Sequence, residues 1–143
     1  MPYEDHAMEQ FYFLSIVMNL LAGSAIIITN APDKGTAFDG IRHFFSDMTV
    51  RLVVGILAAT IGLLKLIIVM RGDIPVIGDI IPAFAGIASG TKLFLEFYQK
   101  NASVTTDTLD KFNSFFEKYV KTLGFAAVAA EILHFLIPQV VLL

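Results

Sequence analysis

Residues 11–28 contain no charged side chain, and three further stretches of the chain are nearly as apolar. A helix that crosses a bilayer needs about 20 apolar residues, because each residue advances about 1.5 Å through a hydrocarbon core about 30 Å thick. We therefore expect spans at residues 11–28, 51–70, 80–99 and 120–142. Charged residues make up 16% of the chain, against about 25% in an ordinary soluble domain. The sequence predicts an all-α integral membrane protein with four transmembrane helices and one domain over residues 1–143.

The start of the third span is set by its prolines. Pro75 and Pro82 exclude a continuous helix over the whole stretch after residue 73. A helix that begins at Ile80, with Asp79 as its N-cap, keeps Pro82 in the first turn, where the missing N–H costs no hydrogen bond.

Lysine and arginine gather in two of the three connections, at residues 29–50 and 100–119 and just beyond them. Such cations favour the cytoplasmic side of a membrane. We therefore expect both connections to be cytoplasmic, both termini to lie outside, and the protein to reside in the plasma (inner) membrane. The N-terminus lacks the positive region of a cleavable signal peptide, so the first span is expected to be retained. The cations are Lys34, Arg42, Arg51, Lys100, Lys111, Lys118 and Lys121.

The two halves of the chain, residues 1–71 and 72–143, repeat one order of elements: span, polar connector, amphipathic stretch, span. A shift of 71 residues pairs Asn30 with Asn101 and Asp39 with Asp110, whereas the small and polar residues of the second and fourth spans align at a shift of 69. We predict a duplicated two-helix repeat, related by a pseudo-twofold axis along the membrane normal.

Each half also contains an amphipathic stretch rich in phenylalanine, at about residues 38–52 and 109–123. Each stretch is expected to begin a helix on the cytoplasmic side that lies at the interface or continues into the following span. These aromatic faces have two interpretations. They contact lipid and pack within the molecule, or they dock a cytoplasmic partner.

Small residues recur at helical spacing in three spans and predict close helix packing. Gly86 and Gly90 form a GxxxG pattern in the third span. Gly55 and Gly62 share one face of the second span, and Gly124 lies on a comparable face of the fourth.

Ionisable and polar residues inside the spans are the candidate site. Glu131 and His134 share one face of the fourth span, and Asn19, Lys65 and Lys92 lie in the first, second and third. Charges within a bilayer are costly and normally face the protein interior beside a partner. We expect Lys92 to partner Glu131, Asn19 or Lys65 to partner His134, and the Lys65 ammonium to reach toward the outer headgroups.

Each candidate has a functional and a structural interpretation. Glu131 binds a cation or relays a proton, or it forms a structural ion pair with Lys92 that fixes helix register. His134 shuttles a proton, or it is a hydrogen-bonded core residue. Asp73, Asp79 and Glu9 shape an acidic outer mouth, or they are solvated loop and capping residues.

Several kinds of chemistry are not expected. The chain has no cysteine, and no hydrolase, metalloprotease or nucleotide-binding motif occurs. Glu131 and His134 form an ExxH pattern, but the second such pattern of a di-iron bundle is missing. We therefore predict no metal, no cofactor and no enzymatic activity. A net charge of −3 gives no indication of nucleic-acid binding.

Two functions remain open. The first is permeation or transport of a proton, a cation or a small solute along a polar path near Glu131, with a homo-oligomer supplying further walls. The second is a non-transporting accessory or assembly subunit of a larger membrane complex, in which the buried charges only fix packing. The expected partners are therefore the lipid bilayer and either further copies of the chain or a larger complex.

Overall fold

The computed structural model describes residues 2–32, 39–70, 80–102, 104 and 106–136, and the side chains of residues 2–9 and 68–70 are not described. Over these residues the regular structure is entirely helical. The helices are α1 (Pro2–Asn30), α2 (Asp39–Ser46), α3 (Met48–Met70), α4 (Ile80–Asn101), α5 (Asp107–Lys118) and α6 (Val120–Leu136).

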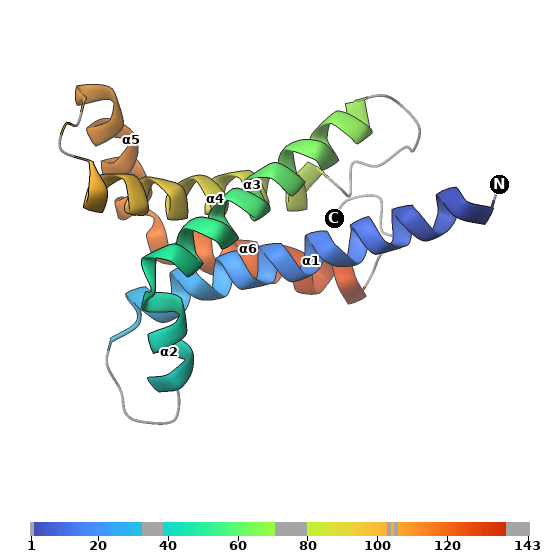
Figure 1. Cartoon of the computed structure of the whole chain (residues 1–143), viewed down its shortest axis with the longest axis horizontal. Coiled ribbons are helices and arrows are strands. Elements are labelled where there is room, and N and C mark those ends of the chain that lie inside the picture. The colour runs from blue at the N-terminus through green and yellow to red at the C-terminus, as the bar shows by residue number, and fades with distance from the viewer. Residues whose placement is uncertain (1, 33–38, 71–79, 103, 105, 137–143) are drawn as a thin grey trace.

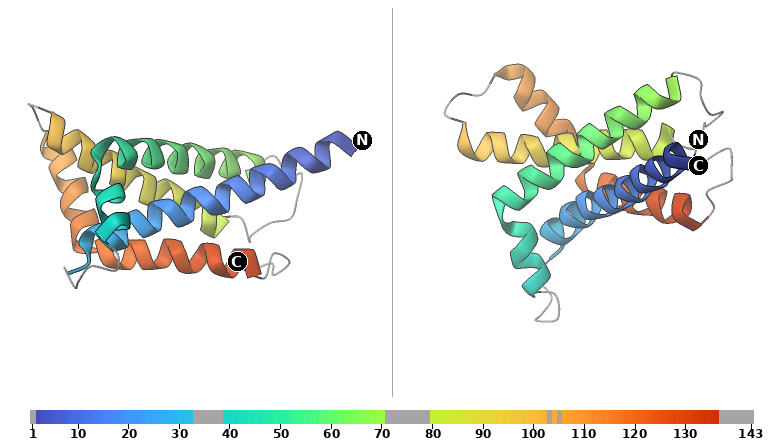
Figure 2. Two further views of the ribbon diagram at one scale, coloured as in Figure 1. Left: turned by 60° about the horizontal axis from the view of Figure 1, so that its bottom comes forward. Right: turned by 45° about the vertical axis from the view of Figure 1, so that its right-hand side comes forward.

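Four long helices, α1, α3, α4 and α6, form an elongated bundle (Figure 1). The most extensive contacts join α3 to α4 and α1 to α6, while α1 also packs against α3 and α4, and α4 packs against α6. The short helices α2 and α5 both lie at the end of the bundle opposite the N-terminus (Figures 1 and 2). Successive long helices therefore run in opposite directions.

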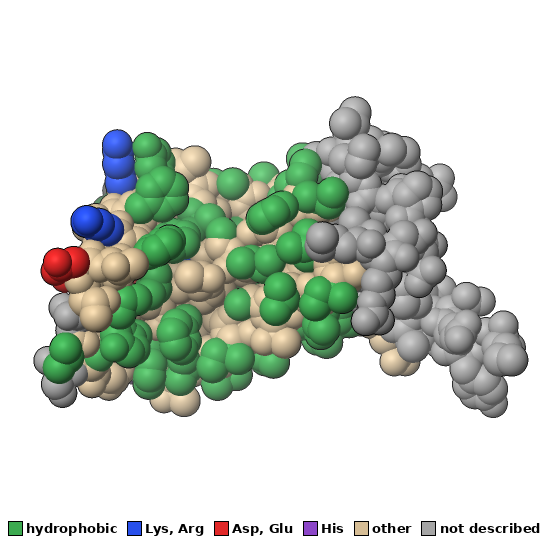
Figure 3. Space-filling model, turned by 90° about the horizontal axis from the view of Figure 1, so that it is seen from above, with side chains coloured by type: hydrophobic (Ala, Val, Ile, Leu, Met, Phe, Trp, Pro, Cys, Tyr) green, Lys and Arg blue, Asp and Glu red, His purple; other side chains and the backbone are tan. Residues whose placement is uncertain are grey.

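Polarity in this bundle is distributed as expected for a protein in lipid. Large apolar side chains such as Phe13, Phe84 and Phe125 are more than half exposed on the sides of the bundle. The visible side surface is largely hydrophobic, and the charged side chains in view gather at the α5 end (Figure 3). Polar side chains are instead buried inside: Ser15, Asn19, Arg51, Lys65, Ser89, Lys92, Glu131 and His134.

Helices α1, α3 and α4 each contain a stretch long and apolar enough to cross a membrane: Gln10–Asn30, Met48–Ile67 and Ile80–Asn101. Helices α5 and α6 qualify together as a fourth candidate, bent by 67° between them. The described protein thus has three or four candidate spans, consistent with a membrane location. The residues of the expected fourth span beyond 136 lie outside the described residues.

The first amphipathic stretch does not run into the following span as one helix. Helix α2 ends at Ser46, and the Asp47 carboxylate accepts hydrogen bonds from the backbone N–H groups of Thr49 at 2.7 Å and Val50 at 3.1 Å. Asp47 therefore caps the start of α3. The backbone N–H donors of Val50 and Thr49 stabilise the carboxylate form and lower the pKa of Asp47 below its ordinary value.

The glycines of the spans lie where two helices approach most closely. A Cβ at Gly90 would come 2.5 Å from the carbonyl oxygen of Gly55, and one at Gly55 would come 3.0 Å from that of Gly90. Gly23 of α1 and Gly124 of α6 face each other in the same reciprocal way, at 3.1 Å and 3.3 Å. The small residues predicted to pack helices therefore make contacts within this bundle.

Candidate functional site

Glu131 is fully buried where α1, α4 and α6 meet. Its Oε1 accepts a hydrogen bond from Asn19 Nδ2 at 2.5 Å, and the same amide donates to the carbonyl oxygen of Pro82 at 3.0 Å. Both Asn19 and Glu131 have no exposed surface. One amide group thus ties the carboxylate of α6 to the first turn of α4.

This contact also fixes the depth of α4 relative to α1. Asn19 lies near the middle of the apolar stretch Gln10–Asn30, whereas Pro82 is the third residue of α4. Helix α4 therefore begins beside the middle of that apolar stretch, not beside the N-terminal end of α1. The positive end of the α4 macrodipole consequently lies at the level of the Glu131 carboxylate, where it favours negative charge.

Gly86 is the residue that makes room for Asn19. A Cβ at Gly86 would come 2.5 Å from Asn19 Oδ1 and 3.1 Å from the carbonyl oxygen of Ala58. Asn19 Oδ1 is buried without a hydrogen-bond partner. Gly86 thus admits the amide that holds Glu131, which is a more specific role than general helix packing.

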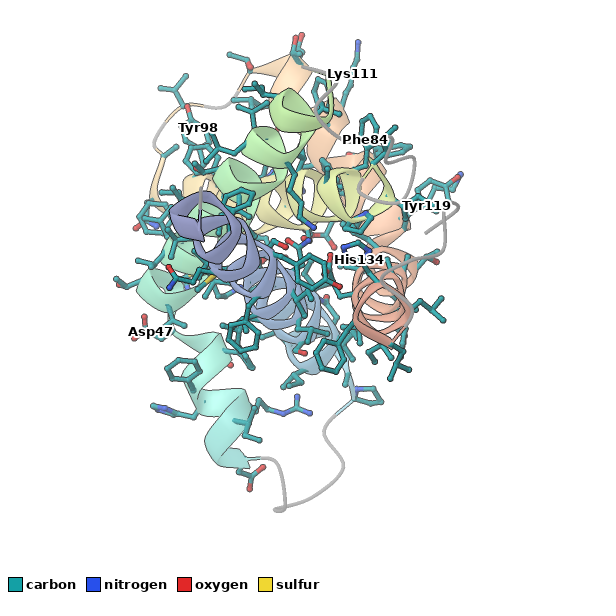
Figure 4. The ribbon with its side chains drawn as sticks, turned by 90° about the vertical axis from the view of Figure 1, so that its right-hand side faces the viewer. Asp47, Phe84, Tyr98, Lys111, Tyr119 and His134 are labelled. Carbon is teal, nitrogen blue, oxygen red and sulfur yellow. The ribbon has the colours of Figure 1, made fainter. Side chains whose placement is uncertain are left out.

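His134 lies one helical turn beyond Glu131 and belongs to a second buried cluster, inside the bundle (Figure 4). Its Nε2 is 3.5 Å from the Lys65 ammonium, and its ring lies 5.0 Å from the Tyr12 ring. The Lys65 ammonium also lies 5.4 Å from the centre of the Tyr12 ring, within the range of a cation–π contact.

Tyr12 also donates a hydrogen bond to a backbone carbonyl near the end of α6. Its hydroxyl donates to the backbone carbonyl oxygen of His134 at 2.8 Å. In a regular helix that carbonyl would accept from the N–H four residues later, but residue 138 is proline and has no N–H. The Tyr12 hydroxyl therefore provides the donor that Pro138 lacks.

A third cluster surrounds Lys92, nearer the α5 end of the bundle. The fully buried Lys92 ammonium lies 3.1 Å from Glu96 Oε1 and forms a short ion pair with Glu117 of α5. Glu96 is also paired with Arg51 of α3. Two cations and two carboxylates from three helices thus balance each other, which offsets the cost of burying Lys92.

These clusters contain one of the expected pairings and replace another. Lys92 was expected to partner Glu131, but its ammonium pairs with Glu96 and Glu117 instead. Glu96 lies one turn further along α4, and Glu117 belongs to α5, which packs against this end of the bundle. Lys65 was expected either to partner His134 or to extend toward the outer headgroups, and the structure has the first arrangement and not the second. Its side chain is buried because His134 and Tyr12 offer its ammonium contacts inside the bundle.

The predicted and the observed site residues overlap in part. Asp73 and Asp79 of the expected acidic mouth lie outside the described residues, as does the side chain of Glu9. Tyr12 was not among the predicted site residues, although it belongs to the His134 cluster. Its spacing from Ser15 and Asn19 was the available signal, since positions three and four residues apart share a helix face.

The chemical groups gathered in the site are ionisable side chains. A carboxylate, an imidazole and two ammonium groups are buried in three clusters from α1, α3, α4 and α6. Among the described residues, no group of three or more His, Asp or Glu side chains could hold a metal ion.

The fold and the site define a class of protein: a helical bundle with an apolar exterior and buried clusters of ionisable side chains. The sequence profile of one protein family matches residues 8–134, which is most of the chain, so the protein belongs to that family. It is similar to an uncharacterized protein of Treponema pallidum (strain Nichols), with 32% identity over 126 residues that cover 88% of this chain and 92% of the relative. No solved structure matches.

Proposed function

We propose that the protein is a small multi-pass membrane protein that conducts or transports a proton or a small monovalent cation. The observation that carries this proposal is the fully buried Glu131, held by the neutral amide of Asn19 inside a bundle with an apolar exterior. A buried carboxylate is costly as a bare charge, so taking up a proton or a cation stabilises it. Such a group can bind and release the transported species.

The order of polar groups along the bundle supports a path. His134 and Lys65 lie on the outer side of Glu131, and the buried Ser89 follows on α4 before Lys92 and its carboxylates. From Pro82 to Lys92 the helix advances about 15 Å, at about 1.5 Å per residue. Relays of this kind suit protons, which need only stepwise contacts between titratable groups and water.

The start of α4 at the level of Glu131 is a second support. The N-terminal end of a helix dipole favours negative charge, and some transporters use such ends to act on the bound species. The first turn of α4 lies beside Asn19 and Glu131, although α4 itself is long enough to be a full span.

Flux in sealed proteoliposomes tests the proposal. We expect dissipation of an imposed proton or monovalent-cation gradient by the wild-type protein and its loss in Glu131→Gln, which keeps the side-chain shape and can still accept from Asn19. Asp107→Asn, which removes an exposed carboxylate of α5, is the matched control and should conduct normally. Equal flux in both variants would remove Glu131 from the mechanism, and no flux in any protein would refute conduction.

An accessory or assembly subunit is the second candidate. It is favoured by the balanced ion pairs of Lys92, which have the form of a structural network. Against it, the GxxxG residues Gly86 and Gly90 are already used inside the bundle. Cross-linking in native membranes distinguishes the two: recovery of only homo-oligomers favours the conducting protein, and a stoichiometric larger partner favours the subunit.

We also propose that residues 1–71 and 72–143 are a duplicated repeat. Support comes from the two reciprocal glycine contacts, α1 Gly23 with α6 Gly124 and α4 Gly90 with α3 Gly55. A twofold axis would exchange these contacts, with α1 corresponding to α4 at a shift of 67 residues and α3 to α6 at a shift of 69. The shift of 71 at the helix ends then requires one extra turn in α4, and the return to a shift of 69 requires two fewer residues between Asp110 and Gly124 than between Asp39 and Gly55.

The proposed orientation puts α2 and α5 on the cytoplasmic face of the plasma (inner) membrane and both termini outside. The cations Arg42, Lys111 and Lys118 at that end support it. Because the chain has no cysteine, Lys34→Cys gives a single labelling site. We expect its modification by a membrane-impermeant thiol reagent only after the membrane is opened, and labelling from outside would reverse the orientation.

A further inference from the structure

The two short helices extend sideways from the same end of the bundle. Helix α2 and helix α5 leave it on opposite sides (Figure 1 and the right view of Figure 2). Each presents exposed apolar side chains: Ile41 and Phe44 on α2 are 47% and 52% exposed, and Phe112 and Phe115 on α5 are 57% and 60% exposed. Helix α5 has no buried residue at all.

Helix α5 is oriented so that it could lie along a flat surface perpendicular to the bundle axis. Its bend of 67° from α6 leaves α5 about 23° from the plane perpendicular to α6. Exposed apolar side chains continue from α5 onto the side of the bundle, where Phe125 of α6 is 61% exposed. Exposed apolar side chains thus occur both on α5 and on the adjacent side of the bundle.

Helices α2 and α5 form two arms, and their arrangement favours a lipid surface over a protein partner. Their apolar faces lie on opposite sides of the bundle, so one globular partner would have to surround the bundle end to reach both. A planar lipid leaflet contacts both at once. Acidic and basic residues are mixed on each arm, with Asp39 and Arg42 on α2 and Asp110 and Lys111 on α5, which is compatible with zwitterionic headgroups.

We infer that α2 and α5 are interfacial helices that insert Phe44 and Phe115 at the boundary between phospholipid headgroups and acyl chains. This inference rests on the proposed membrane location, but not on transport. The two arms hold the α5 end of the bundle at a fixed depth, because each inserted aromatic side chain gains hydrophobic free energy only at that level.

Single tryptophan variants test the inference, since the native chain contains no tryptophan. Phe44→Trp and Phe115→Trp are reconstituted separately in phosphatidylcholine vesicles whose acyl chains are brominated either near the headgroup or near the terminal methyl. We expect blue-shifted emission from both variants and stronger quenching by the bromines near the headgroup. Phe125→Trp, on the side of the bundle, is the comparison and should be quenched more by the deeper bromines than the arm positions are.

The alternative outcomes are distinct. Emission at the wavelength of aqueous tryptophan, with quenching by acrylamide, would show that the arms are in water and would overturn the inference. Blue-shifted emission that neither bromine nor acrylamide quenches would show that protein, such as a second copy, covers them and would also overturn it. If Phe125→Trp responds to brominated lipid while the arm positions do not, the membrane location stands and only this inference fails.

Discussion

Replacing Gly86 by alanine tests the close approach of α4 to Asn19 in the candidate site. In an unobstructed helix this change stabilises by about 0.5–1 kcal/mol, because alanine loses less backbone entropy than glycine. Here the new Cβ would lie 2.5 Å from Asn19 Oδ1 and 3.1 Å from the carbonyl oxygen of Ala58, so Asn19 must move. Overpacking of this kind costs about 1–3 kcal/mol. We therefore expect a net loss of stability of about 1–2 kcal/mol and displacement of the amide that holds Glu131.

Gly40→Ala is the matched control, because a Cβ at this position of α2 would meet no atom within 4 Å. It should leave stability unchanged or raise it by up to about 1 kcal/mol. Reversible unfolding by SDS in mixed micelles, followed by circular dichroism, measures both variants. Adding Asn19→Ala to Gly86→Ala should recover part of the loss in a double-mutant cycle. If Gly86→Ala is as stable as the wild type, the proposed contact between α4 and Asn19 is refuted.

Three further perturbations have defined outcomes. Gly90→Ala should destabilise more than Gly86→Ala in the same unfolding assay, because the obstructing atom is the backbone oxygen of Gly55 and not a side chain. Tyr12→Phe should accelerate hydrogen exchange near the end of α6, since it removes the donor to the His134 carbonyl, and unchanged exchange would contradict the role assigned to that hydroxyl. The lowered pKa of Asp47 makes its carboxylate stabilise the folded state above the ordinary value of 3.8 and lose that effect as pH falls through the folded pKa. The stability advantage of wild type over Asp47→Asn should therefore shrink on acidification, and a constant difference would contradict it.

The sequence predicted the features that depend on local pattern. Apolar stretches and the position of Pro82 indicated the long helices, and helical spacing placed Asn19, Glu131 and His134 among inward-facing polar residues. These predictions depend only on helix periodicity and on the cost of charge in an apolar environment. The closely packed glycines were recognisable for the same reason.

The pairing of polar groups could not be read from the sequence, because it depends on the relative depth of helices. Counting residues from the expected outer boundary put Lys92 close to Glu131. In the structure α4 begins beside the middle of the apolar stretch of α1, so Pro82 and not Lys92 is at the level of Glu131. Lys92 is thereby carried toward α5, where Glu117 pairs with it. Nothing in the pattern of α5 alone indicates that partner.

The contact between Lys65 and His134 has a further meaning if the halves arose by duplication. These residues are 69 positions apart, the same shift that relates α3 to α6, so they occupy equivalent places facing each other across the axis. In an ancestral dimer of identical halves, one residue type would have faced its own copy, and two buried lysines would have repelled each other. Under the proposed duplication, joining the halves in one chain would have allowed the two positions to diverge into the present imidazole and ammonium, which lie 3.5 Å apart.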